Sequence, residues 1–171
     1  MQKVRANINL SAILGNAQSF KNATKTRLYA VVKANAYGHG AEEVTACLAS
    51  VADGFAVALI EEGIAIRTAA CGKDILVFTP PLNEEEMYAL AVNGFVATIP
   101  DLWTAKLAVR VCQKHGLRLA VHLKVNTGMN RYGMHLSMLG KVCRCRPCRR
   151  RSRRRRSWGP WWGWCWARRR P

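Results

Sequence analysis

Residues 31–40 read VVKANAYGHG, and this stretch decides how the rest of the chain is interpreted. A short apolar run leads directly into Lys33 and then into a loop with two glycines. A lysine at a strand end is most often a solvated side chain. The alternative is an amine that forms a Schiff base, held where partial desolvation favours its reactive neutral form. In that interpretation Tyr37 could reach the same place, and Gly38 and Gly40 would let the backbone approach a ligand.

Apolar runs of the same kind recur along the first 140 residues. They are rich in Val, Ile, Leu and Phe and barely alternate with polar residues, which is typical of parallel strands covered on both faces. The five predicted strands are Leu28–Lys33, Gly54–Ile60, Ile75–Thr79, Gly94–Ile99 and Leu117–Val125.

Helical patterns lie between these runs. One helix is expected to begin near Ser11, and Asn83 and Asp101 have the side chains and positions of helix N-caps. Alternating strands and helices favour a parallel α/β sheet with right-handed connections. The strand spacing of roughly 20 to 25 residues predicts a (β/α)₈ barrel of the TIM type, of which the chain holds about five βα units. A doubly wound open sheet is the alternative, but no G-x-G-x-x-G motif follows the first strand.

The net charge of +17 is distributed very unevenly. Residues 1–140 contain 14 basic and 10 acidic residues, whereas residues 141–171 contain 13 basic residues and no acidic one. This second region also holds five of the six tryptophans and lacks the apolar pattern of an amphipathic element. We therefore predict a partial barrel domain over 1–140 and a non-globular, disordered, low-complexity basic tail over 141–171.

The tail allows three interpretations. Its arginines and tryptophans could bind nucleic acid, by contacting phosphates and stacking on bases. Cys143, Cys145 and Cys148 could contribute to a metal site, although no fourth ligand lies at a convincing spacing. The abrupt change of composition favours a frame-shifted translation of GC-rich sequence. Even then, the arginine run would bind polyanions non-specifically.

Two further features bear on the cellular compartment. No charged-then-apolar leader and no run of about 18 apolar residues is present, so neither a signal peptide nor a membrane span is expected. Cys47, Cys71 and Cys112 are widely spaced and are interpreted as reduced, buried thiols. A cytoplasmic protein is predicted.

A second stretch, HLKVNTGMNRYGM at residues 122–134, follows the fifth predicted strand. Lys124 and Arg131 frame an Asn-Thr-Gly turn. The guanidinium of Arg131 is a rigid, permanently charged fork suited to a phenolate or a carboxylate. The alternative is an ordinary strand-to-loop turn with one exposed arginine.

Together, AVVKANAYGHG and HLKVNTGMNRYGM resemble the two signature motifs of the alanine racemases, in the same order and at the ends of the first and fifth strands. The resemblance extends from about residue 3 to about residue 140. It implies a pyridoxal 5′-phosphate enzyme that interconverts L-alanine and D-alanine. It also implies a barrel domain, a mostly β carboxyl-terminal domain and a homodimer.

The resemblance also implies residue roles. Lys33 would hold the cofactor and act as base or acid on one face of the substrate α-carbon. Tyr37 would contact the cofactor phosphate, and Arg131 would bind near the phenolic oxygen of the cofactor and the substrate carboxylate. Lys124 matches a lysine that is often carbamylated and that positions this arginine. No metal ion is expected.

In the family, a tyrosine from the carboxyl-terminal domain of the partner subunit serves the second face of the substrate. No motif of this chain matches that tyrosine, so we expect the 171-residue chain to be inactive in racemisation. Two other functions stay open at this point: a non-catalytic barrel protein that binds pyridoxal phosphate, and nucleic-acid binding through the tail.

Overall fold

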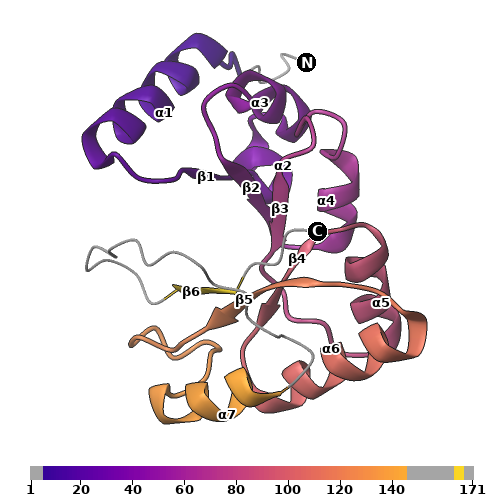
Figure 1. The fold of residues 1–171 in the computed structure, drawn as a ribbon. Helices are drawn as coiled ribbons and strands as arrows, with labels where there is room; N and C mark the ends of the chain where they lie inside the picture. Colours follow the sequence, from indigo (N-terminus) through magenta and orange to yellow (C-terminus); the bar gives the residue numbers. More distant parts are fainter. Residues whose placement is uncertain (1–5, 146–163, 168–171) are drawn as a thin grey trace, which may run out of the picture. The chain divides into compact units, whose positions relative to one another are not determined.

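The computed structural model describes residues 6–145 and the backbone of residues 164–167 (Figure 1). The chain divides into two compact units, and the boundary along the sequence falls between Leu76 and Val77. Both units are built from short parallel strands and helices that alternate along the chain. Within the described residues, no helix is long and apolar enough to cross a membrane.

Within its described residues, 6–76, the first unit contains strands β1 and β2, most of β3, and helices α1 to α4. Strands β1 and β2 pair in parallel, with Tyr29 opposite Gly54 and Val31 opposite Ala56, and β3 follows β2 in the sheet. Helix α1 packs on α3, and α4 packs on β2. The bounds in chain order are α1 Leu10–Thr24, β1 Tyr29–Val31, α2 Lys33–Gly38, α3 Ala41–Leu48, β2 Gly54–Val57, α4 Ile60–Ala65 and β3 Asp74–Val77.

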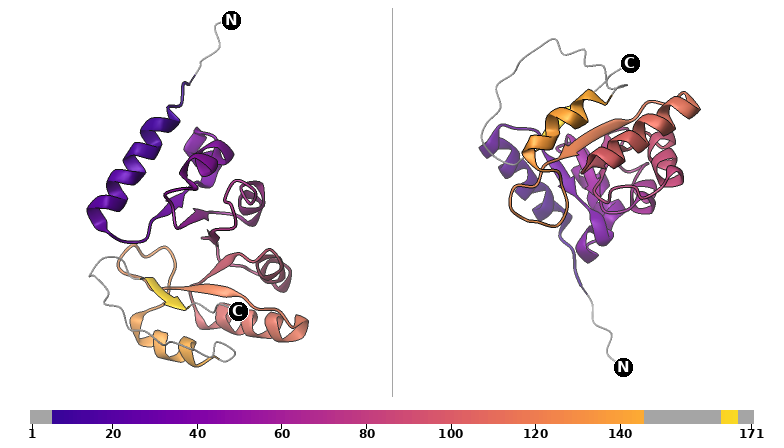
Figure 2. Two further views of the ribbon diagram at one scale, coloured as in Figure 1. Left: turned by 45° about the horizontal axis from the view of Figure 1, so that its top comes forward. Right: turned by 90° about the horizontal axis from the view of Figure 1, so that it is seen from below.

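The second unit continues the same pattern. Strands β4 and β5 are parallel, with Val96 opposite Ala120 and Ile99 opposite Leu123. Helices α5 and α6 pack on each other and on β4 (Figure 2). The bounds are α5 Glu84–Val92, β4 Val96–Ile99, α6 Leu102–His115, β5 Ala120–Lys124, the 3₁₀ helix η1 Leu136–Met138, α7 Leu139–Arg144 and β6 Trp164–Ala167.

The predicted helix caps are confirmed. The side chain of Asn9 accepts a hydrogen bond from the N–H of Ala12, so α1 begins close to Ser11. Asp101 accepts from the N–H of Thr104 at 2.7 Å at the start of α6. At α5, Asn83 accepts from the N–H of Glu86 at 2.8 Å, as expected.

Each unit has an apolar core built by its strands. Strands β2 and β4 are buried along their whole length. This explains why apolar and polar residues do not alternate in their sequences, since helices or other segments of the same chain cover both faces. The largest buried side chains include Phe55, Ile66 and Ile75 in the first unit and Phe95, Met87 and Val111 in the second.

Three sequence-based predictions need correction. Lys33 is not the last residue of a strand, because β1 ends at Val31 and Lys33 begins α2. Ile60 is the first residue of helix α4, not the end of a strand. The expectation of buried thiols is wrong, because Cys71 is exposed and Cys47 and Cys112 are only half-buried.

The predicted tail is described only in part. Helix α7 extends to Arg144, beyond the predicted boundary at residue 140, and its Val142 is buried. Residues Trp164–Ala167 form β6, which pairs antiparallel with β5. Residues 146–163 and 168–171 lie outside the described part of the chain, and so does Cys148 of the considered metal site.

Candidate active site

Lys33 lies just beyond the carboxyl end of β1. The N–H of Val32 donates to the carbonyl of Ala56 at 2.9 Å, so the pairing with β2 continues up to the residue before the lysine. Lys33 is half-buried. The carboxyl ends of parallel strands are where α/β proteins bind ligands, and the amine of Lys33 is attached at that edge.

The backbone after Lys33 turns in an unusual direction. Ala34, Asn35, Ala36 and Tyr37 have φ values of 51°, 54°, 51° and 56°, so α2 is a left-handed turn. For non-glycine residues other than Asn, this conformation is unfavourable by roughly 1–2 kcal/mol each. Such strain persists only where the surrounding structure imposes it, and it is concentrated at functional sites.

Hydrogen bonds on both sides hold this turn. The N–H of Ala36 donates to the carbonyl of Val32 at 2.9 Å, and the N–H of Gly40 donates to the carbonyl of Asn35 at 3.1 Å. The side chain of Asn35 accepts from the N–H of Ala41 at 2.8 Å, where α3 begins. Gly40 itself has φ 90°, which glycine adopts without penalty.

Glu62, a residue that the sequence analysis did not single out, fastens the start of the turn. Its Oε1 accepts from the N–H of Ala34 at 2.7 Å. Its Oε2 accepts from the N–H of Ala58 at 2.7 Å and from that of Leu59 at 3.1 Å. One carboxylate therefore joins the residue after Lys33 to the junction between β2 and α4.

Two opposing effects act on the Glu62 carboxyl. Partial burial by itself would raise its pKa, but the three N–H donors and the positive charge of Lys33 outweigh this, so the pKa is lowered. The carboxylate form is the one that the site stabilises. A sequence signal for this residue existed: Glu62 is the third residue of a helix that follows a buried strand, where an acid can return a bond to the helix start.

Tyr37 completes the first group of predicted residues. It ends the left-handed stretch, and its side chain is 62% exposed. The structure thus places Lys33 and Tyr37 on the same turn.

The second predicted stretch forms a closed loop after β5. The N–H of Met134 donates to the carbonyl of Lys124, and the N–H of Asn126 donates to the carbonyl of Met134, both at 2.9 Å. Inside the loop, Asn126 Oδ1 accepts from the N–H groups of Gly128 and Asn130 at 3.1 and 3.2 Å. Asn126 Nδ2 also donates to Asn130 Oδ1 at 2.7 Å.

Lys124 and Arg131 both contact the ring of Tyr132. Lys124 Nζ lies 5.8 Å from the ring centroid and Arg131 Cζ lies 5.6 Å from it, which is within the range of cation–π attraction. The hydroxyl of Tyr132 donates to the carbonyl of Phe78 at 3.2 Å. Sequence reasoning missed Tyr132 because its role depends on how the loop folds.

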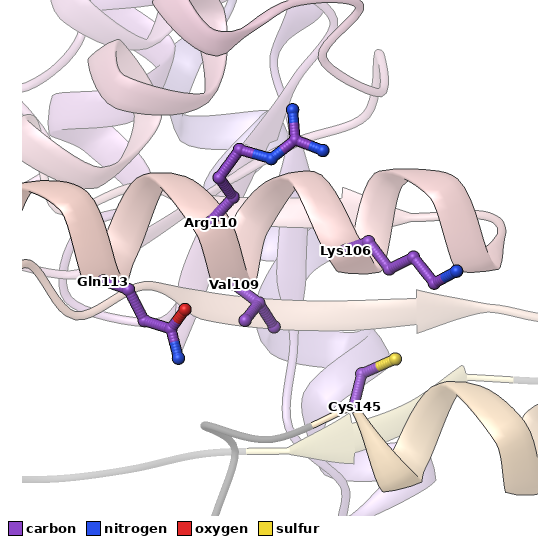
Figure 3. A pocket seen from close by; sticks show the side chains of 5 residues that line it. All are labelled: Lys106, Val109, Arg110, Gln113 and Cys145. Atoms are coloured by element: carbon purple, nitrogen blue, oxygen red, sulfur yellow. The ribbon is translucent and has the colours of Figure 1, made fainter.

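A separate hollow of about 320 Å³ lies in the second unit. It is lined by Lys106, Val109, Arg110 and Gln113 of α6 and by Cys145, which follows α7 (Figure 3). Lys33, Tyr37, Lys124 and Arg131 do not line it, whereas Cys145 is one of the cysteines considered for a metal site. Arg110 is also paired with Glu84, at 3.4 Å.

The chain is similar to known proteins over most of its described length. A family model described as "Alanine racemase, N-terminal domain" matches residues 8–147. An alanine racemase of Lactobacillus delbrueckii subsp. bulgaricus is 41% identical over 129 residues, which are 74% of this chain and 34% of that protein. One of Methanococcus maripaludis is 40% identical over 131 residues, or 75% and 35% of the two chains.

Solved structures agree with this match. The alanine racemase of E. faecalis superposes with a TM-score of 0.72 at 33% identity, covering 80% of this chain and 38% of that one. The biosynthetic alanine racemase of Pseudomonas aeruginosa gives 0.69 at 34% identity, covering 78% and 37%. These neighbours confirm the predicted α/β fold of the barrel type.

This chain spans about a third of the length of the curated relatives that it matches. The shared region includes both signature stretches, at residues 31–40 and 122–134. The resemblance inferred from the sequence is thereby confirmed, and the chain belongs to the alanine racemase family, whose N-terminal domain it matches.

Proposed function

We propose that this chain provides the part of an alanine racemase that binds pyridoxal 5′-phosphate, with Lys33 as the residue that holds the cofactor. The observation that carries the proposal is the half-buried residue Lys33 just beyond the carboxyl end of β1, followed by a strained left-handed turn. A lysine that forms a Schiff base must hold its amine in a fixed direction, and a strained turn directly after the lysine is suited to that.

The residues present fit this cofactor. An aldehyde requires a primary amine, which Lys33 supplies at the edge of the sheet. A phosphate group requires hydrogen-bond donors, which the phenol of Tyr37 can supply on the same turn. When bound, the cofactor withdraws electrons from the α-carbon of the amino acid, so that its proton becomes easier to remove.

The side chains of this chain would then divide the remaining tasks. Lys33 would move the proton on one face of the α-carbon. Arg131 would bind the carboxylate of alanine through its guanidinium fork. Lys124, when carbamylated, would carry a negative charge toward Arg131 and restrain it, since both side chains lie against the ring of Tyr132. A tyrosine of the partner subunit would serve the second face, in a cytoplasmic homodimer as the resemblance implies.

Borohydride reduction tests the assignment of Lys33. The protein would be mixed with one equivalent of pyridoxal phosphate, reduced, digested and mapped by mass spectrometry. We expect the pyridoxyl group on Lys33, and its loss in Lys33→Ala. Lys106→Ala, which removes an exposed lysine of α6, is the matched control and should leave the labelling of Lys33 unchanged. A label spread evenly over other lysines would contradict the proposal.

A racemisation assay separates the alternatives. Labelling of Lys33 with turnover of L-alanine by the intact protein supports the racemase. Labelling without turnover, in a homodimer that is fully loaded, supports a non-catalytic protein that binds the cofactor. That the 171-residue chain alone is inactive stays a prediction, and robust turnover by a clean preparation would overturn it.

A further inference from the structure

We propose that Glu62 is a positioning residue for Lys33, and that it fixes the direction of the amine by holding the peptide that joins Lys33 to Ala34. The inference rests on the proposed function of Lys33, which it deepens. It is carried by the three hydrogen bonds of the Glu62 carboxylate.

The arrangement of these bonds is specific. The two oxygens of Glu62 face different segments: Oε1 binds the N–H of Ala34, and Oε2 binds the N–H groups of Ala58 and Leu59. All three partners are donors, so only a group that accepts at both ends satisfies them. A carboxylate does so and an amide does not, since the NH₂ of a glutamine would face an N–H group on one side.

The bond to Ala34 acts where the backbone is strained. Ala34 is the first residue of this turn with a positive φ, and its N–H belongs to the peptide that follows the Lys33 α-carbon. Without a fixed acceptor at this point, the turn can relax toward an ordinary conformation, and the side chain of Lys33 then changes direction. The bonds to Ala58 and Leu59 connect this peptide to the fully buried strand β2, which is a rigid support.

The first measurement is amide hydrogen exchange in Glu62→Gln. We expect exchange at Ala34 to become roughly five- to tenfold faster, as for a lost hydrogen bond. The N–H groups of Val32 and Ala52, which donate to the carbonyls of Ala56 and Leu48, lie outside the turn and should stay protected. Faster exchange at all three positions would indicate general unfolding, and no change at Ala34 would overturn the proposal.

The second measurement compares two aldehydes in the same variant. Reductive methylation with formaldehyde should modify Lys33 at least about threefold faster, because the amine is less restrained. Selective labelling of Lys33 by one equivalent of pyridoxal phosphate should instead fall by roughly tenfold, because the amine points elsewhere. Lys73, which donates to the carbonyl of Ala52, is the internal reference whose methylation should not change.

Controls separate position from folding. Glu61→Gln removes the neighbouring acid of the same helix turn and should reproduce the wild type in both measurements. Glu62→Asp keeps the charge, but its side chain is one methylene shorter and cannot bridge both segments. This variant replaces Glu62→Gln in both measurements if Glu62→Gln does not fold. In that variant, as in Glu62→Gln, we expect cofactor labelling of Lys33 to fall and its formaldehyde methylation to become faster.

The outcomes distinguish this inference from the proposed function. Equal labelling of Lys33 by pyridoxal phosphate in wild type and Glu62→Gln would overturn the role of Glu62 and leave Lys33 as the cofactor residue. No labelling of wild-type Lys33, with the expected changes in exchange and methylation, would overturn the cofactor role and keep the role of Glu62 in positioning. No labelling and no change would overturn both.

Discussion

The two signature stretches are held in place by different means. After Lys33, the backbone itself is forced into a left-handed turn, and one carboxylate and several main-chain bonds keep it there. Around Arg131, main-chain bonds between Met134 and residues 124 and 126 close the loop, the side chain of Asn126 holds its interior, and the ring of Tyr132 lies against two cations. The first stretch fixes an amine through the main chain, whereas the second orients charged side chains through other side chains.

This difference predicts how each stretch responds to substitution. A main chain held in an unfavourable conformation needs every bond that imposes it, so changes there should have large effects or reverse their usual sign. A loop whose interior is held by side chains should lose free energy of unfolding in smaller amounts with each substitution. Four substitutions examine this contrast.

Glu62→Ala should have the largest effect. Three N–H groups lose their acceptor, and hydrogen bonds to a charged group in a half-buried place contribute more than neutral ones. We expect the free energy of unfolding to fall by about 2 kcal/mol in chemical denaturation. Glu61→Ala, the matched exposed acid, should change it by less than about 0.5 kcal/mol. Equal effects of the two substitutions would remove the special role of Glu62.

The difference in the free energy of unfolding between wild type and Glu62→Ala should depend on pH. The pKa of Glu62 is lowered in the folded state from an ordinary value of 4.5, so its stabilisation is complete above that pH and is lost as the pH falls through the folded-state pKa. The gap between wild type and Glu62→Ala should therefore be widest near neutral pH and narrow in acid. A gap that stays constant down to pH 2 would show that the carboxylate form does not matter.

Asn126→Ala should have the next largest effect. It removes an acceptor of two N–H groups and a donor to Asn130, in a loop that is mostly exposed. We expect a loss of about 1.5 kcal/mol, and faster proteolysis within residues 126–134. Asn126→Asp keeps both accepted bonds and should lose less than half as much. The exposed neighbour Thr127→Ala is the control and should be nearly neutral.

Tyr132→Phe should be milder still. It removes the bond from the hydroxyl to the carbonyl of Phe78 but keeps the ring against Lys124 and Arg131. A loss of about 1 kcal/mol is expected. Tyr88→Phe, at an exposed tyrosine of α5, is the comparison and should be close to neutral. A larger loss in Tyr88→Phe than in Tyr132→Phe would contradict the assigned contact.

Ala34→Gly should have the smallest effect, and of opposite sign. Ala34 is exposed with φ 51°, so glycine relieves the strain, and its greater freedom in the unfolded chain offsets part of the gain. A gain of about 0.5 kcal/mol is expected. Ala46→Gly, at an exposed position of the right-handed helix α3, should lose about 1 kcal/mol. The same sign at both positions would contradict a strained turn.

Much of the fold could be predicted from local sequence. The apolar runs located the parallel strands, because strands covered on both faces keep few polar residues. Asn83 and Asp101 predicted the starts of α5 and α6, because a capping side chain acts over only three residues. These features depend on short-range physics, which the sequence displays directly.

Less of the candidate site could be predicted from the sequence. The sequence Ala-Asn-Ala-Tyr has no local preference for four consecutive left-handed residues. Hydrogen bonds to Val32, to Glu62 and to the start of α3 impose that conformation. Glu62 lies 29 residues from Lys33, and only the pairing of β1 with β2 brings them together. The roles of Lys33, Tyr37, Lys124 and Arg131 in binding cofactor and substrate stay predictions.

The central claim is that the strained turn fixes the amine of Lys33 for an aldehyde cofactor. A crystal structure of the protein reduced with borohydride in the presence of pyridoxal phosphate tests it most directly. The account predicts continuous density from Lys33 Nζ to the pyridoxyl group, with Ala34–Tyr37 at positive φ and Glu62 bound to the N–H of Ala34. Density on another lysine, or a right-handed turn after Lys33, would contradict it.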